Sequence, residues 1–158
     1  MSLSPAQLAI LRTLVQGEVS LASARTTGDD GAIAAWLNAP VSPAFIVWKT
    51  RVSIADTGQA FNGAEWAGMV TANISRLQCV ATYLADGYNA ALADIRAMFT
   101  DIWSGAGGAT TRASLLALWK RSATRAEKAL ATGTGSDVSP ATLTLESLVT
   151  NDECSSMR

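Results

Sequence analysis

The stretch NGAEWAGMVTANISRLQCVATYL, residues 62–84, carries the strongest structural pattern in the chain. Six of its residues recur at steps of four and three, so they form a stripe along one face of a helix. The pattern starts at Asn62, and Asp86-Gly87 breaks it after the last stripe position. The pattern therefore predicts one helix of about 20 residues. Its stripe consists of Trp66, Val70, Asn73, Leu77, Val80 and Leu84.

Two further amphipathic helices are predicted after this one. The first follows Asn89, which can cap it, and the glycine-rich residues 104–108 end it. The second begins at Thr110 or Thr111. Three consecutive amphipathic helices with short connections predict antiparallel neighbours in a bundle. The two stripes are Leu92, Ile95, Phe99 and Ile102, and then Leu116, Trp119, Ala123, Ala126 and Leu130.

The N-terminal third contains two more helix signals. Ser4-Pro5-Ala6-Gln7 combines a capping serine, a proline at the first helical position and a glutamine three residues after the cap. That helix ends at Gly17 or continues to about Ala24. A short helix is predicted over residues 32–38, with an aspartate as its cap. Residues 43–48 favour a short helix, and residues 49–61 a connector with some extended structure. The fold class is therefore mainly all-α, a compact bundle of about five helices over residues 1–131.

Residues 132–158 form a separate C-terminal arm in this interpretation. A flexible turn precedes TLTLE, residues 142–146, in which polar and apolar residues alternate as they do in a strand. A single strand needs a hydrogen-bonding partner. The segment therefore pairs with residues 51–55, pairs with another chain, or is not a strand. Pairing with another chain would make Leu143 and Leu145 interface residues.

Composition excludes several classes of function. The chain has 158 residues, of which 49% are hydrophobic, and a formal net charge of -1. It is long enough for one domain and too nearly neutral to attract nucleic acid or an anionic membrane through its overall charge. It contains no histidine, which rules out Ser-His-Asp nucleophile systems and histidine-ligated metal sites. We therefore expect no enzymatic activity, cofactor or metal.

Three tryptophans and a basic cluster are the candidate interface residues. Trp36, Trp48 and Trp103 stand beside predicted helix ends, where an interface role fits the enrichment of tryptophan at protein contacts. For the two remaining tryptophans, Trp66 and Trp119, we expect core packing. The basic residues that share one predicted helix face have two interpretations. A solvated face is favoured, and contact with nucleic acid or an acidic protein surface is the alternative. These residues are Arg121, Arg125 and Lys128.

The two cysteines, Cys79 and Cys154, lie far apart in the sequence. Two free thiols are the favoured interpretation, and a disulfide within or between chains is the alternative. We expect Cys154, in the polar arm, to be the more exposed of the two. The sequence shows neither a signal peptide nor a membrane-spanning stretch, so we expect a soluble protein that is made in the cytoplasm.

Several stretches resemble a family of small proteins encoded among the virion genes of tailed bacteriophages and prophages. They are SPAFIVWKT at residues 42–50, KRSATRAEK at 120–128, ATGTGSDVSPAT at 131–142 and, more loosely, SPAQ at 4–7. The resemblance is most specific over residues 119–146. It carries no catalytic residue.

The resemblance implies a structural role in the particle, where small helical proteins commonly connect the portal to the tail. Its partners would be other copies of this chain and the portal, capsid or tail proteins. A ring at the head-tail neck is the placement that we expect, with the arm of residues 132–158 exchanged between subunits. Capsid decoration and a tail-associated role are the alternatives. A different class of function is a small phage-encoded protein that binds and inhibits a host factor.

Overall fold

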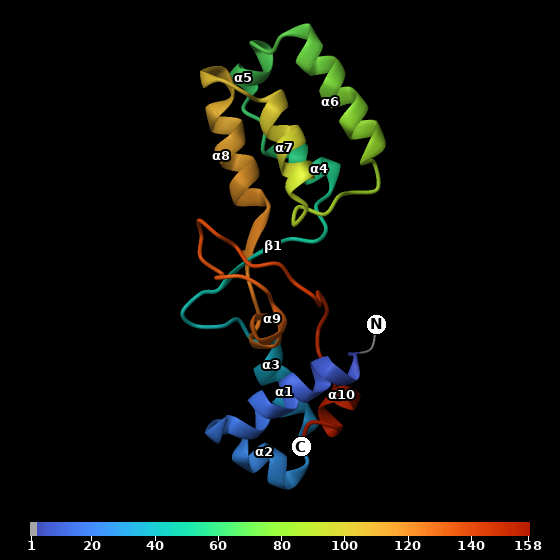
Figure 1. Ribbon diagram of the computed structural model, residues 1–158, viewed down its shortest axis with the longest axis vertical. Coiled ribbons are helices and arrows are strands. Elements are labelled where there is room, and N and C mark those ends of the chain that lie inside the picture. The colour runs from blue at the N-terminus through green and yellow to red at the C-terminus, as the bar shows by residue number, and fades with distance from the viewer. Residues whose placement is uncertain (1–2) are drawn as a thin grey trace. The chain divides into compact units, whose positions relative to one another are not determined.

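A computed structural model describes residues 3–158 of the chain. Helices dominate these residues, and one small two-stranded antiparallel sheet joins them (Figure 1). The contacts divide the chain into two units, one formed by Met1–Val47 and Ser122–Arg158 and the other by Trp48–Arg121. The mainly helical class is therefore as predicted, whereas the division differs from the predicted one, because residues 122–158 associate with the N-terminal third. None of the helices in residues 3–158 has the length and apolar character that a bilayer crossing requires.

The first unit begins with two helices that the sequence predicts well. Ser4 and Gln7 form the predicted capping box at the start of the first helix. The chain leaves this helix at Glu18, which has an extended backbone, so the longer alternative to Ala24 is wrong. Asp29 caps the predicted short helix by accepting from the amide of Ala32. The helices of this unit are α1 (Pro5–Gly17), α2 (Ala22–Thr27), α3 (Asp30–Asn38), α9 (Arg125–Leu130) and α10 (Asn151–Ser155), with a 3-10 turn at Val19–Leu21.

The C-terminal arm completes the core of this first unit. Residues 141–146 alternate between buried and exposed, as the sequence pattern predicts. Ala141 pairs with Val47, and Thr142 with Thr132, so the extended segment has its partners within its own chain and not at residues 51–55. The main core combines residues of α1 and α3 with residues of the arm. Its fully buried members are Leu11, Val15, Ile33, Leu37, Ala126, Cys154 and Met157, and Leu145 and Val149 are almost fully buried beside them.

The second unit is a set of short helices around an aromatic core. Figure 1 shows these helices together, in green to orange. Trp119 lies in this core as predicted, and its indole nitrogen donates to the hydroxyl oxygen of Tyr88 at 2.8 Å. Phe99 packs against both rings. The helices are α4 (Ile54–Gln59), α5 (Gly63–Ala67), α6 (Thr71–Tyr83), α7 (Ala93–Ile102) and α8 (Ala109–Leu118), with a 3-10 turn at Ala106–Gly108.

The predicted continuous helix over residues 62–84 is wrong. A helix does begin after Asn62, which caps it, but that helix, α5, ends at Ala67. Val70 has an extended backbone before α6 begins. The break redirects Trp66 from the expected core to the surface, where 43% of it is exposed and its ring stacks on Phe61. Gly68 stands at the break and is its local sign, because glycine disfavours a helix interior.

The predicted helix from residue 110 to 130 is also wrong. It divides into α8, the strand β2 (Lys120–Ser122) and α9. The predicted short helix at 43–48 is instead the strand β1 (Ile46–Trp48), which pairs with β2. The connector expected over 49–61 contains α4, which Ser53 caps. Backbone hydrogen bonds between residues 45–49 and 119–123 account for the two strands, because they occupy groups that a helix would use locally. The start of α4 is local, since it depends on the cap at Ser53.

The packing of the arm predicts a large effect at its last buried residue. Met157→Ala should lower the free energy of unfolding by about 2–5 kcal/mol, because it leaves a cavity in the main core. Leu148→Ala, at an exposed position of the same arm, should change it by less than about 0.5 kcal/mol. Urea unfolding of the two variants in dilute solution measures both values. Equal effects would contradict the packing of the arm on its own chain.

The carboxylate of Glu65, in α5, accepts hydrogen bonds from the start of α8 and predicts a pH dependence of the stability of the fold. Glu65 accepts from the backbone amides of Thr110 and Thr111, each at 2.8 Å. Burial raises the pKa of Glu65, but the hydrogen bonds from Thr111 and Thr110 outweigh it and lower this pKa from 4.5 to about 2. A pKa that is lower in the folded state means that the carboxylate stabilises the fold above its ordinary pKa and loses this effect as the pH falls through about 2.

Glu65→Gln should therefore unfold at a lower urea concentration than the unchanged chain at neutral pH. The difference between the two should shrink steadily as the pH is lowered toward about 2, where the carboxylate of the unchanged chain takes up its proton. Asp86→Asn, in an exposed loop after α6, is the matched control. A difference that is independent of pH would show that the charge of Glu65 contributes nothing.

Candidate interaction groove

A groove in the first unit brings together three of the residues that the sequence singles out. Trp36 comes from α3, and Arg125 and Lys128 come from α9. The groove has a volume of about 330 Å³. Apolar side chains from three segments complete it. They are Leu14 from α1, Val41 from the loop after α3, and Ala129 from α9.

Local sequence explains why α9 begins where it does. Thr124 accepts from the amide of Glu127, and the Glu127 carboxylate accepts from the amide of Thr124, so the two residues form a capping box. The amide of Arg125, the first residue of α9, donates to the carbonyl oxygen of Ala39 at 3.1 Å. The amide of Val41 donates to the carbonyl oxygen of Ala123 at 3.1 Å. These bonds hold the start of α9 beside the end of α3.

Each of the two cations of the groove lies over an aromatic ring. The guanidinium carbon of Arg125 is 4.7 Å from the ring centroid of Trp36, and its Nη1 donates to the carbonyl oxygen of that residue at 2.9 Å. The ammonium of Lys128 is 5.7 Å from the ring centroid of Phe45. Such cation-ring contacts are worth about 0.5–1 kcal/mol at exposed sites. Both positive charges of the groove therefore lie beside aromatic rings.

The positive charge of the groove is not neutralised by an ion pair. Among residues 3–158, no carboxylate lies within salt-bridge distance of Arg125 or Lys128. The pKa of Glu18 is lowered mainly by hydrogen bonds from Ser20, and Arg125 adds only a small part of that effect. Arg25 instead donates to the carbonyl oxygens of Val15 and Glu18. The groove is therefore a site that favours an anionic group next to an apolar one.

The structure places the other candidate interface residues elsewhere. Trp48 is half-buried in the second unit beneath the guanidinium of Arg96, whose carbon is 4.0 Å from the ring centroid. Trp103 is buried in the core of that unit, so the expected interface position is wrong. Arg121 lies in β2 and does not share a helix face with Arg125, because the predicted helix is interrupted.

The arm residues and the cysteines also differ from expectation. Leu143 and Leu145 are buried within the first unit, so they are not available to a second chain in this conformation. Both cysteines are free thiols. The expected order of exposure is wrong, because Cys79 is exposed on α6 whereas Cys154 is fully buried on α10. Within the described part of the chain, no group of three His, Cys, Asp or Glu side chains could hold a metal ion.

Sequence reasoning did not single out Val41, which lines the groove, or Phe45, whose ring lies near the ammonium of Lys128. Their position beside α9 follows from backbone pairing with residues 123–125, which leaves no periodic pattern in the sequence. The capping box of Thr124 and Glu127 was the readable signal, because its threonine and glutamate have the spacing that starts a helix. It would have placed a new helix at Arg125.

The difference between the two thiols predicts selective alkylation. Burial raises the pKa of Cys154 to about 11, and Asp30 and Glu153 add to this increase, whereas only the thiolate reacts. Iodoacetamide at neutral pH should therefore modify Cys79 first and Cys154 only after the chain is unfolded in urea. Peptide mass spectrometry after timed quenching measures both rates. In Cys79→Ser, the remaining thiol should react slowly, and fast reaction there would contradict the burial of Cys154.

Comparison with known proteins leaves the groove as the main guide to function. No family model, no curated protein and no solved structure matches the chain. The resemblance to phage virion proteins stays a prediction from the sequence.

Proposed function

We propose that this chain is a structural protein of a tailed-bacteriophage particle, and that it acts through protein contacts as a ring-forming adaptor at the head-tail neck. The role is non-catalytic. Two independent observations support the proposal. The first is the sequence resemblance over residues 42–50 and 120–142. The second, which carries the argument for a binding role, is the groove that gathers Trp36, Arg125 and Lys128.

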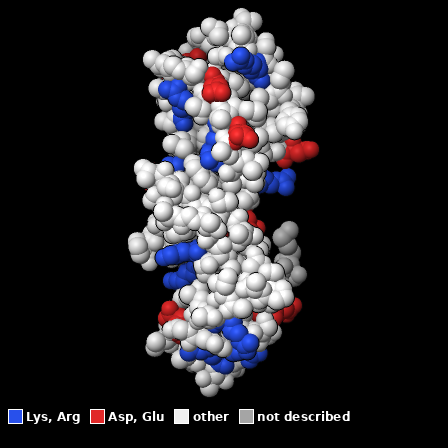
Figure 2. Space-filling model, viewed as in Figure 1, with Lys and Arg blue, Asp and Glu red and all other residues white. Residues whose placement is uncertain are grey.

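The chemistry of the groove favours a protein partner over nucleic acid. Arginine and tryptophan are enriched at the centres of protein interfaces, where apolar neighbours exclude water. Stacking of nucleic-acid bases needs open aromatic faces. Here Arg125 lies over the Trp36 ring and Lys128 over the Phe45 ring. On the face seen in Figure 2, basic and acidic side chains are interspersed and form no continuous basic surface. The partner would be a second copy of the chain or a portal, capsid or tail protein.

Deletion of the gene from its phage or prophage tests this role. Loss of an adaptor should leave DNA-filled heads and separate tails, because the junction cannot form, and electron microscopy of the lysate would show both. Expression of the unchanged chain from a plasmid should restore joined particles. Mass spectrometry of purified complete particles should detect the chain.

Other outcomes point to the alternative functions. Joined particles that are only less stable would indicate capsid decoration, and defective tails a tail-associated role. Normal particles that lack the chain would contradict the structural role altogether. That result would favour a phage-encoded protein that binds a host factor.

A further inference from the structure

The arm of the first unit presents an exposed aliphatic side chain beside a carboxylate. Leu148 is 69% exposed, although Val149, the next residue, is buried in the main core. The side-chain amide of Asn38 donates to the carbonyl oxygen of Val149 and accepts from its amide, both at 2.9 Å. These bonds hold the backbone so that Leu148 points away from the core. Asp152 is exposed in the first turn of α10, four residues later.

This part of the arm is chemically complementary to the groove. The groove offers apolar contacts from Leu14, Val41 and Ala129, which suit the side chain of a leucine. It also offers two cations that form no salt bridge with a carboxylate of the described residues. An aspartate beside the leucine would supply the missing negative charge.

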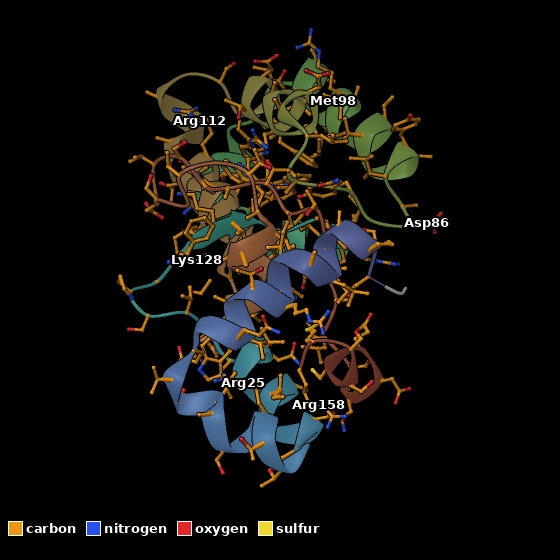
Figure 3. The ribbon with its side chains drawn as sticks, turned by 60° about the horizontal axis from the view of Figure 1, so that its bottom comes forward. Arg25, Asp86, Met98, Arg112, Lys128 and Arg158 are labelled. Carbon is orange, nitrogen blue, oxygen red and sulfur yellow. The ribbon has the colours of Figure 1, made fainter. Side chains whose placement is uncertain are left out.

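A copy of the chain does not place its own Leu148 in its own groove. Trp36 lines the groove and Asn38 holds the arm, and these two residues of α3 are two positions apart. Positions two apart on a helix differ by about 200° around its axis, so the groove and the arm lie on different sides of α3. Figure 3 agrees, because Lys128 and α10 appear on opposite sides of α1.

We infer that the segment from Leu148 to Asp152 of one copy occupies the groove of the next copy, in a head-to-tail contact. Leu148 inserts between the apolar walls, and Asp152 pairs with the cations of α9. Different surfaces of the two copies meet, so the contact repeats and closes into a ring when the rotation per subunit allows it. The inference deepens the proposed function, on which it rests for the assumption that the groove binds protein.

A mixing experiment with the full chain tests the inference. Sedimentation of the unchanged chain should show concentration-dependent association, and added salt should weaken it. The groove variant Lys128→Glu and the arm variant Leu148→Asp should each weaken self-association at least about tenfold. Mixed together, they should form a complex of one copy of each. Lys128→Glu keeps an intact arm, which can occupy the intact groove of Leu148→Asp.

Matched controls separate this contact from general effects of charge. Arg51→Glu reverses an exposed charge in the second unit, and Val138→Asp adds a charge at a position that is 93% exposed. Both should associate like the unchanged chain. Circular dichroism checks that the helix content is kept, and Lys128→Ala replaces Lys128→Glu if the latter unfolds.

Three results would overturn the inference. They are a monomeric unchanged chain, variants that associate like their controls, and a mixture of weakened variants that forms no complex. These results are independent of the gene deletion. Association of the purified chain without a neck phenotype would contradict only the proposed function, and a neck phenotype with a monomeric chain would contradict only the head-to-tail contact.

Discussion

Backbone hydrogen bonds between residues 39–49 and 119–125 are the constraint on which the rest of the structure depends. Within the second unit, the amide of Lys49 donates to the carbonyl oxygen of Trp119. Within the first unit, the amide of Ala123 donates to the carbonyl oxygen of Phe45. In a continuous helix, these groups would bond to residues four positions away. Because they bond to a distant segment instead, α8 ends at Leu118 and a new helix begins at Arg125. The interruption positions α9, whose Arg125 and Lys128 line the groove.

The sequence predicted those elements whose signals are local. The caps of α1 and α3 stand beside the helices that they define, and Ile95, Phe99 and Ile102 of the predicted stripe lie in α7, so the structure confirms these signals. The start of α7 is wrong, because exposed Leu92 and not Asn89 is its N-cap. The strands are missed because a distant partner decides their conformation, whereas the break at Gly68 and the cap at Ser53 are local. Residues 120–122 lie between Trp119 and Ala123, two positions of a helical stripe, and yet form a strand, because residues 46–48 compete for their backbone groups. Alternation at residues 142–146 correctly predicted which side chains face inward, but it contained no information about which chain would cover them.

The groove residues show the same division. Arg125 and Lys128 are three positions apart and share a face of any helix that contains both, so the interrupted helix still keeps them together. Arg121 was grouped with them only through the part of the helix that does not form. Trp36 was recognised by its residue type beside a helix end. What the sequence could not provide was the meeting of these elements, because it results from tertiary packing of α9 against α1 and α3.

The order of the two units along the chain has a consequence for folding during synthesis. Residues 48–121 are continuous, so the second unit has all the residues of its core as soon as Arg121 has been made. The first unit cannot bury its core at that stage, because Leu11 and Val15 are covered in part by residues that include Met157. The apolar faces of its N-terminal helices therefore stay uncovered while more than half of the chain is synthesised. Such exposed surfaces are prone to aggregation, and they are a target for chaperones that bind nascent chains.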